Sequence, residues 1–164
     1  NENLKEAFAG ESQANRRYLA YAKKAKSEGY PEIANLFRAA AEAETVHAMA
    51  HLRVTGEVRS TKENLDEAMK GESYEFKQMY PKFIAEAGQE DNKAALASFK
   101  NAMAVEQVHF SLFNDAAKAL EEGKDLPTRN IFICNVCGNT VVDKVPDKCP
   151  VCGAEKDKFT AVKE

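Results

Sequence analysis

Apolar residues recur at alternating steps of three and four through four segments of the first 123 residues. This spacing places them along one face of an α-helix, so each segment is predicted to be an amphipathic helix that buries one face in a shared core. The predicted helices cover residues 4–27, 31–55, 61–87 and 92–122. Because the connections between them are short, the pattern favours an antiparallel four-helix bundle.

Glycine, proline and capping residues mark the ends of the first helices. Gly29 and Gly56 suit the position just after a last turn, and Pro31 suits the first turn of the second helix. Ser60, followed three residues later by Glu63, predicts a capping box that opens the third helix.

One break is expected in the second half of the helical region. Pro81 lies inside the third helical pattern, where it removes a backbone donor, so we expect the helix to kink or stop there. Gly88 is expected to close that helix, Asp91 to cap the fourth, and Gly123 to end it.

The helical period disappears after Gly123. Residues 126–128 are typical of a linker and residues 130–134 of a short strand, and the remainder is punctuated by glycine and proline turns. All four cysteines fall within residues 134–152. The sequence therefore predicts two domains, an all-α four-helix bundle over residues 1–126 and a small, loop-rich β module over residues 127–164.

One helical motif occurs twice. Glu-x-x-His is present in the second and the fourth predicted helix, and Gly-Glu-Ser is present in the first and the third. A carboxylate and an imidazole three residues apart project from one helical face. Each half of the bundle thus contributes one Glu from its first helix and a Glu-x-x-His pair from its second. The six residues are Glu11, Glu44, His47, Glu72, Glu106 and His109.

These four carboxylates and two imidazoles occupy positions that should otherwise face the core. Ionised carboxylates are costly to bury unless cations compensate for their charge. An oxygen-rich set with two imidazoles suits iron or manganese, and paired Glu-x-x-His helices are a ligand pattern of two-metal sites in helix bundles. We therefore predict a two-metal centre. The alternative, ordinary surface Glu and His, is disfavoured by the repeat.

The two halves differ at one position. Glu75 lies one turn after Glu72, whereas the matching residue of the first half is Ala14. Six ligands complete a symmetric centre, so Glu75 would be a seventh. We hypothesise that Glu75 competes with His47 for one metal, with the carboxylate favoured in the oxidised state because its charge stabilises the more highly charged ion.

Two tyrosines and a third histidine share these helical faces. Tyr18 follows Glu11 by two turns and Tyr80 follows Glu72 by two turns. Each hydroxyl is a candidate to donate to a metal-bound carboxylate or to help protonate bound oxygen species, and the alternative is an amphipathic core tyrosine. His51 is interpreted as a packing or supporting residue and not as a ligand.

Four cysteines form two Cys-x-x-Cys knuckles, and this pairing predicts a tetrahedral four-thiolate metal site. Disulfides are the alternative, which paired knuckles and a reducing compartment oppose. Spacing alone does not separate structural zinc from a mononuclear iron that cycles one electron, but a neighbouring di-iron centre would give an iron relay a purpose. The ligands are Cys134, Cys137, Cys149 and Cys152.

Charge and hydropathy exclude some partners. The net charge is −3 with both signs interspersed, which argues against a nucleic-acid or anionic-membrane surface. No apolar run approaches the roughly 18 residues of a membrane helix, and residues 1–5 lack signal-peptide character. We expect a cytoplasmic protein that binds neither nucleic acid nor membrane.

Together these motifs resemble the rubrerythrin family, in which a ferritin-like di-iron bundle is fused to a C-terminal rubredoxin-like domain. The resemblance covers essentially the whole chain and rests on residues 7–14, both Glu-x-x-His motifs, Gly71-Glu72-x-x-Glu75, Met79-Tyr80-Pro81 and the two knuckles. It implies that the four cysteines hold a rubredoxin-type iron and that Tyr18 and Tyr80 support the di-iron centre. The implied di-iron ligands are Glu11, Glu44, His47, Glu72, Glu75, Glu106 and His109.

The resemblance implies a non-haem peroxidase that reduces hydrogen peroxide to water in oxidative-stress defence. Electrons would pass through the rubredoxin-type iron and come ultimately from NAD(P)H. An external electron-donor redox protein would supply them, because the chain has no dinucleotide or flavin fingerprint. The alternative is a ferritin-like ferroxidase or iron-handling protein, for which a rubredoxin relay has little use. A third possibility is a zinc ribbon attached to an interaction scaffold.

Chain geometry predicts the assembly. From His109 to Gly123 a helix runs about 21 Å at roughly 1.5 Å per residue, and the linker leads farther away unless it folds back. We therefore expect the chain's own cysteine iron to be too distant from its own di-iron site for fast electron transfer. The prediction is a homodimer in which each cysteine module docks near the partner's di-iron centre. The family also includes helix-swapped dimers, for which residues 55–61 are the place of exchange.

Overall fold

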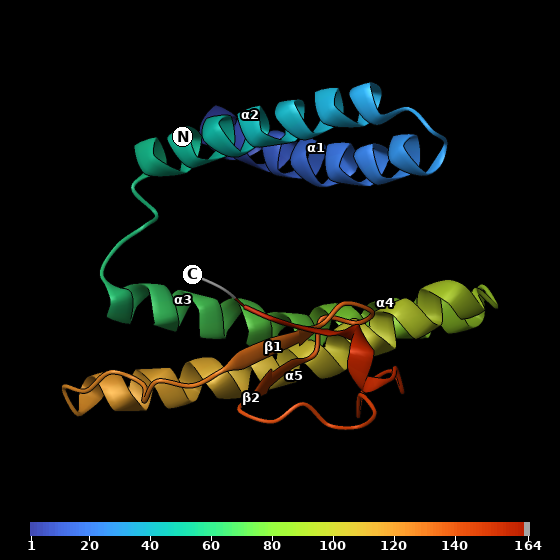
Figure 1. The fold of residues 1–164 in the computed structure, drawn as a ribbon. Helices are drawn as coiled ribbons and strands as arrows, with labels where there is room; N and C mark the ends of the chain where they lie inside the picture. The colour runs from blue at the N-terminus through green and yellow to red at the C-terminus, as the bar shows by residue number, and fades with distance from the viewer. Residues whose placement is uncertain (163–164) are drawn as a thin grey trace. The chain divides into compact units, whose positions relative to one another are not determined.

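The computed structural model describes residues 1–162. The chain forms two compact units, the second of which begins at Ser60. Each unit is built on one pair of neighbouring helical rods (Figure 1). The first contains α1 (Glu2–Ser27) and α2 (Pro31–Thr55). The helices of the second are α3 (Thr61–Tyr74), η1 (Glu75–Met79), α4 (Tyr80–Gln89) and α5 (Lys93–Glu121). Its C-terminal part contains β1 (Ile131–Cys134), β2 (Thr140–Val142), η2 (Lys156–Lys158) and β3 (Phe159–Ala161).

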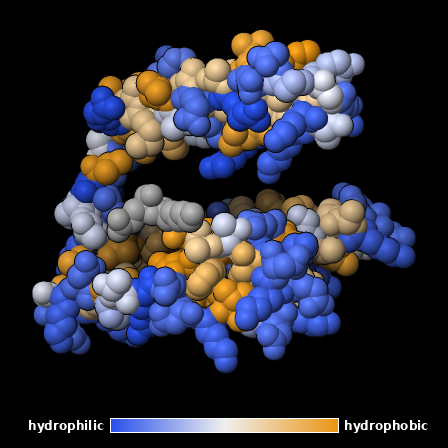
Figure 2. Space-filling view, in the orientation of Figure 1, coloured by the Kyte–Doolittle hydropathy of each residue, from blue (hydrophilic) through white to orange (hydrophobic). Residues whose placement is uncertain are grey.

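Small residues form the contact between α1 and α2. The buried residues are all alanines, namely Ala22 and Ala25 of α1 and Ala34, Ala41 and Ala48 of α2. Short side chains at a helix contact allow the two axes to approach closely. Larger apolar side chains of this unit remain on its surface, as the orange patches of its half of Figure 2 show.

Both ends of α2 and the start of α3 agree with the prediction. Pro31 opens α2, and Gly56 follows its last turn with a φ of 70°. The Ser60 hydroxyl accepts from the Glu63 N–H, and the Glu63 carboxylate accepts from the Ser60 N–H. The predicted capping box is therefore confirmed.

The turn before α5 corrects two predictions. Gly88 lies inside α4 and does not end it. Asp91 adopts a left-handed conformation with a φ of 49°, and the side chain of the next residue, Asn92, accepts from the Ala95 N–H. Asp91 therefore forms the turn that reverses the chain direction, and Asn92 is the N-cap of α5.

Pro81 interrupts the third helix as predicted, and the interruption takes the form of the π turn η1. The Tyr80 N–H donates to the Glu75 carbonyl, five residues back instead of four. Because Pro81 has no N–H to donate, the normal helical ladder is already broken at this point. The helix continues as α4.

The π turn also explains a change in the spacing of the internal repeat. Glu72 follows Glu11 by 61 positions, but Tyr80 follows Tyr18 by 62. A π turn accommodates one extra residue without ending the helix. The inserted residue therefore keeps both the glutamate and the tyrosine of the second half at positions that match the first.

The C-terminal part is a three-stranded antiparallel sheet in the order β2-β1-β3. The chain turns back after α5, so that β1 and β2 lie along this helix (Figure 1). The four long helical segments and the small sheet agree with the predicted fold class. No helix within residues 1–162 has the length and apolar character to cross a membrane.

Candidate metal centres

The four cysteines converge at the tips of the two knuckles. Their sulfur atoms lie within 4.8 Å of one another, with 3.8 Å between Cys134 and Cys152 and 3.6 Å between Cys137 and Cys149. All four are free thiols. Tetrahedral bonds of about 2.3 Å to one metal ion would separate two sulfurs by about 3.8 Å. The donor set thus fits one tetrahedral ion, and the disulfide alternative is wrong.

Backbone amides and burial act in opposite directions on these thiols. Burial disfavours the Cys149 thiolate, but hydrogen bonds from the N–H groups of Cys152 and Val151 and from the side chains of Cys137 and Cys152 together lower the pKa of Cys149 to about 7. Burial raises the pKa of the Cys137 thiol, although the Asn139 N–H favours its thiolate. A bound cation compensates for the burial of thiolates, which is the second reason that the cluster fits a metal.

The first unit gathers three of the predicted ligands. Ligand atoms of Glu11, from α1, and of Glu44 and His47, from α2, lie within 4.8 Å of one another. The His47 Nδ1 is 3.2 Å from the Glu44 carboxylate. A hydrogen bond between the two carboxyl groups raises the pKa of Glu11 and lowers that of Glu44, as expected for two carboxyl groups in direct contact.

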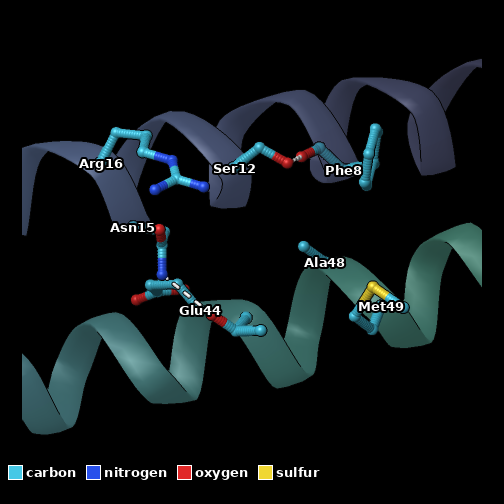
Figure 3. Close-up of a pocket in the computed structure, with 8 residues that line it drawn as sticks. Phe8, Ser12, Asn15, Arg16, Glu44, Ala48 and Met49 are labelled. Carbon is cyan, nitrogen blue, oxygen red and sulfur yellow. Dashed lines mark hydrogen bonds between the residues drawn. The ribbon is translucent and has the colours of Figure 1, made fainter. Parts of the chain in front are cut away.

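Asn15 sets the alignment of the two helices that carry these ligands. Its amide donates to the Ala41 carbonyl at 2.7 Å and to the Thr45 hydroxyl at 2.9 Å. Figure 3 shows the Asn15 side chain directed from α1 towards α2, beside Glu44. Because Asn15 lies one turn after Glu11, and Thr45 is next to Glu44, these bonds place the two carboxylates opposite each other. The bonds border an open pocket of about 210 Å³.

The second unit brings together the other three of the six predicted ligands of the repeated motifs. Ligand atoms of Glu72, from α3, and of Glu106 and His109, from α5, also lie within 4.8 Å of one another. The His109 Nδ1 is 2.9 Å from the Glu106 carboxylate and 3.8 Å from that of Glu72. One Glu72 oxygen is buried without a hydrogen-bond partner among the described residues. Burial and the charge of Glu106 raise the pKa of Glu72 to about 7. A buried acceptor without a donor fits a cation ligand.

Glu75 and Tyr80 belong to the surroundings of this second group. Burial, followed by the negative charge of Glu106, raises the pKa of Glu75, while His109 acts in the opposite direction. Burial, followed by the negative charges of Glu106, Glu75 and Glu72, also raises the pKa of Tyr80. The extra glutamate and the tyrosine therefore both lie close to the carboxylates of the second unit, whereas His47, the proposed competitor of Glu75, belongs to the first.

The first-half tyrosine has mainly aromatic neighbours. The Tyr18 ring lies 6.2 Å from Tyr21 and 6.2 Å from Phe37, measured between ring centroids. The hydrogen bond to Glu44 raises the pKa of Glu11, and the charge of His51 opposes this rise, which places His51 near the first ligand group without making it one of the three.

One contact overturns the expected distance between the cysteine module and the chain's own metal ligands. The His109 Nε2 lies 3.0 Å from the hydroxyl of Thr140, which is part of β2. The linker folds back along α5, so the module docks on the helix that carries Glu106 and His109. The sequence did not point to Thr140, because this contact joins residues 31 positions apart that share no motif.

Comparison with known proteins places the chain among proteins with both kinds of site. The family model described as Rubrerythrin matches residues 2–117, and that of the rubrerythrin rubredoxin-like domain matches residues 132–160. Rubrerythrin-2 of Clostridium acetobutylicum is 38% identical, with 96% of this chain and 94% of the relative covered. Nigerythrin of Nitratidesulfovibrio vulgaris is 35% identical, with 98% and 85% covered. The solved structure of fully reduced, all-ferrous nigerythrin is 34% identical over 98% of this chain and 85% of that one, with a TM-score of 0.59.

Proposed function

Because this chain belongs to the rubrerythrin family, we propose that it is a peroxidase that reduces hydrogen peroxide to water in oxidative-stress defence. Membership makes it an iron-binding oxidoreductase, whose cofactors are a di-iron centre and one rubredoxin-type iron. The observation that favours redox turnover over iron storage is the contact of the cysteine module with His109. An electron relay docked on a ligand helix serves repeated turnover, and storage has no need of it.

We assign residues 1–126 to the di-iron domain and residues 127–164 to the cysteine module. The end of α5 at Glu121 and the start of β1 at Ile131 support a boundary between them. We also assign the di-iron ligands as Glu11, Glu44, His47, Glu72, Glu75, Glu106 and His109. The ligands of the third iron are Cys134, Cys137, Cys149 and Cys152.

When bound, the two bundle irons supply the electron pair that cleaves the oxygen–oxygen bond of the peroxide. The protein must supply protons, because two waters form from one peroxide only when two protons are taken up. Tyr80 is our candidate to deliver one, because a tyrosine hydroxyl carries its proton at neutral pH and this one lies near the ligand carboxylates, whose charges add to burial in raising its pKa. Tyr18 is assigned the matching place in the first half.

The ligand set is divided between the two units, so a complete di-iron centre needs one unit of each kind. The helix pair α1–α2 also exposes large apolar side chains, with Leu36, Val46 and Val54 each 67–70% exposed. We propose a homodimer, with exchange of the α1–α2 pair between two chains through residues 55–61. Apolar side chains exposed along the helix pair would gain free energy from burial against a partner surface, which supports this proposal.

Mixing two defective chains separates the swapped dimer from the unswapped one. One chain carries Glu44→Ala and His47→Ala, and the other carries Glu106→Ala and His109→Ala. In a swapped heterodimer one bundle receives both defective halves and the other receives two intact halves, so peroxide turnover returns. In an unswapped heterodimer each bundle keeps one defect, and absence of recovery in a verified heterodimer would rule out the exchange.

The cysteine iron needs an external electron-donor redox protein, and we propose that NAD(P)H is the ultimate reductant. Val136, between Cys134 and Cys137, is 59% exposed and brings this knuckle to the surface where a donor can touch it. We propose a cytoplasmic location because four free thiols remain available to a metal only in a reducing compartment.

Stopped-flow mixing of the fully reduced protein with hydrogen peroxide tests the function. We expect bundle-iron oxidation at a rate proportional to peroxide concentration, with one peroxide consumed for each di-iron centre. A visible spectrum of the rubredoxin type should accompany two bundle irons and one cysteine-bound iron per chain. Iron deposition into a mineral without peroxide consumption would instead support the ferroxidase alternative.

A further inference from the structure

The two ring nitrogens of His109 face two different parts of the second unit. Nδ1 points to the carboxylates, 2.9 Å from Glu106 and 3.8 Å from Glu72. Nε2 points to the cysteine module, 3.0 Å from the Thr140 hydroxyl. The imidazole thus links a ligand group of the bundle to a strand of the other domain.

The direction of these hydrogen bonds follows from their chemistry. The Thr140 hydroxyl lies 3.3 Å from the Gly138 carbonyl, which can only accept, so the hydroxyl hydrogen has an acceptor there whenever Nε2 of His109 carries a proton. The Thr140 oxygen is then free to accept from Nε2–H of His109. A histidine that binds a metal through Nδ1 carries its remaining proton on Nε2, and this proton needs an acceptor.

The contact is part of a closely packed junction. A β-carbon placed on Gly138 would lie 3.8 Å from the side chain of Val105, one turn before His109 on α5. Val105 is 3% exposed and Asn139 is 2% exposed. The loop from Cys137 to Thr140 is therefore held against α5, and the hydroxyl of Thr140 is in a fixed position relative to the imidazole.

We propose that Thr140 is a positioning residue, which fixes the tautomer and ring orientation of His109 and thereby the affinity of the bundle for its metal. The inference rests on the assignment of His109 as a ligand in the proposed function. Groups that accept the second N–H of a metal-binding histidine orient the ring and raise its basicity. Because Thr140 belongs to the cysteine module, docking of this module also completes the ligand geometry of the bundle.

Anaerobic titration of the metal-free, full-length chain with ferrous iron tests the proposal. Thr140→Val keeps the size of the side chain but removes the acceptor, and we expect bundle affinity to fall by about 10- to 100-fold while the cysteine site is unchanged. Thr140→Ser keeps the hydroxyl and should bind iron as the unchanged protein does. Thr140→Ala removes the hydroxyl without placing a methyl group beside Nε2, so it should weaken binding as the valine variant does.

A second readout reports the tautomer directly. In the zinc-loaded protein, ¹⁵N NMR of the imidazoles should show a slowly exchanging proton on Nε2 of His109 in the unchanged chain and in Thr140→Ser. In Thr140→Val this proton should exchange faster with water. Val142→Ala, on the same face of the same strand, is the control for general loosening of the module and should change neither readout.

Three results would overturn the proposal. Unchanged iron affinity and proton exchange in Thr140→Val would show that the hydroxyl has no effect on His109. Equal losses in Thr140→Ser, or in Val142→Ala, would show that packing and not the hydrogen bond is responsible. None of these measurements depends on peroxide turnover, so a protein without peroxidase activity would refute the proposed function and leave this inference standing.

Discussion

The two ligand groups carry the same motif in different surroundings. In the first unit the His47 side chain is 56% exposed, whereas in the second the His109 side chain is 29% exposed and hydrogen-bonded at both nitrogens. The glutamates of the two motifs, Glu44 and Glu106, are almost equally exposed at 18% and 17%. The repeat therefore reproduces the ligands, and the neighbours make the histidines unequal.

The residues that align the helices also differ between the halves. Asn15 joins α1 to α2 by hydrogen bonds, and the position 61 residues later is Phe76, whose ring packs edge-on against Phe110 at 5.7 Å. A polar link in one half has become an aromatic contact in the other. Two groups with one motif therefore need not respond equally to the same substitution.

The largest expected effect comes from removing one ligand in either half. Glu44→Ala and Glu106→Ala should both lose bundle iron and lower peroxide turnover by more than about 100-fold. The reason is that loss of a residue that only hydrogen-bonds to a metal ligand already lowers metal affinity or activity by about 10- to 100-fold. Iron analysis and steady-state turnover measure this, and the cysteine-iron spectrum should persist. Glu42→Ala, on an exposed position of α2, is the control. Retention of bundle iron in either ligand variant would refute the shared centre.

Loss of the cysteine iron should stop the supply of electrons to the bundle without stopping the reaction of the reduced bundle with peroxide. Cys137→Ser is expected to abolish the visible spectrum of the module and reduce steady-state turnover to near background. Oxidation of a chemically pre-reduced bundle by one addition of peroxide should remain, because the bundle ligands are intact. Lys156→Ala, elsewhere on the module, should retain both activities. Normal steady-state turnover in Cys137→Ser would contradict the relay.

A smaller effect is expected from the glutamate that the first half lacks. Glu75→Gln removes the charge and keeps the size, and we expect turnover to slow by about tenfold through weaker stabilisation of the oxidised irons. The measurement is the midpoint potential of the bundle irons, which should rise in the variant. Glu67→Gln, exposed on α3, provides the comparison. An unchanged potential would remove Glu75 from the ligand set.

The smallest effect concerns the metal-free protein. Between the ordinary carboxyl pKa of 4.5 and about 7, folded Glu72 keeps a proton that the unfolded chain has lost, so rising pH lowers stability through this window. Urea unfolding at several pH values should therefore show a weaker fall in Glu72→Gln than in the unchanged protein.

The matching variant in the first unit should behave differently. Glu11→Gln is expected to change the pH dependence less, because the raised pKa of Glu11 comes first from its hydrogen bond to Glu44, whose own pKa is lowered. Equal effects of Glu72→Gln and Glu11→Gln would show that the two groups are electrostatically alike.

Local signals predicted local structure well. The capping box at Ser60, the helix end at Gly56 and the break at Pro81 follow from backbone chemistry within a few residues, and the structure shows all three. The prediction failed at Asp91, where two adjacent residues compete for one turn and only the three-dimensional path of the chain selects Asn92 as the cap.

The sequence by itself determined which donor atoms are available and how they are grouped. Residues three or four apart on a helix, and cysteines three apart in a knuckle, are brought together by short-range geometry that a linear chain already specifies. Tertiary structure decided what surrounds each group. The turn of the chain after α5 places Thr140 against His109, and this contact depends on packing between distant segments, which no local spacing encodes.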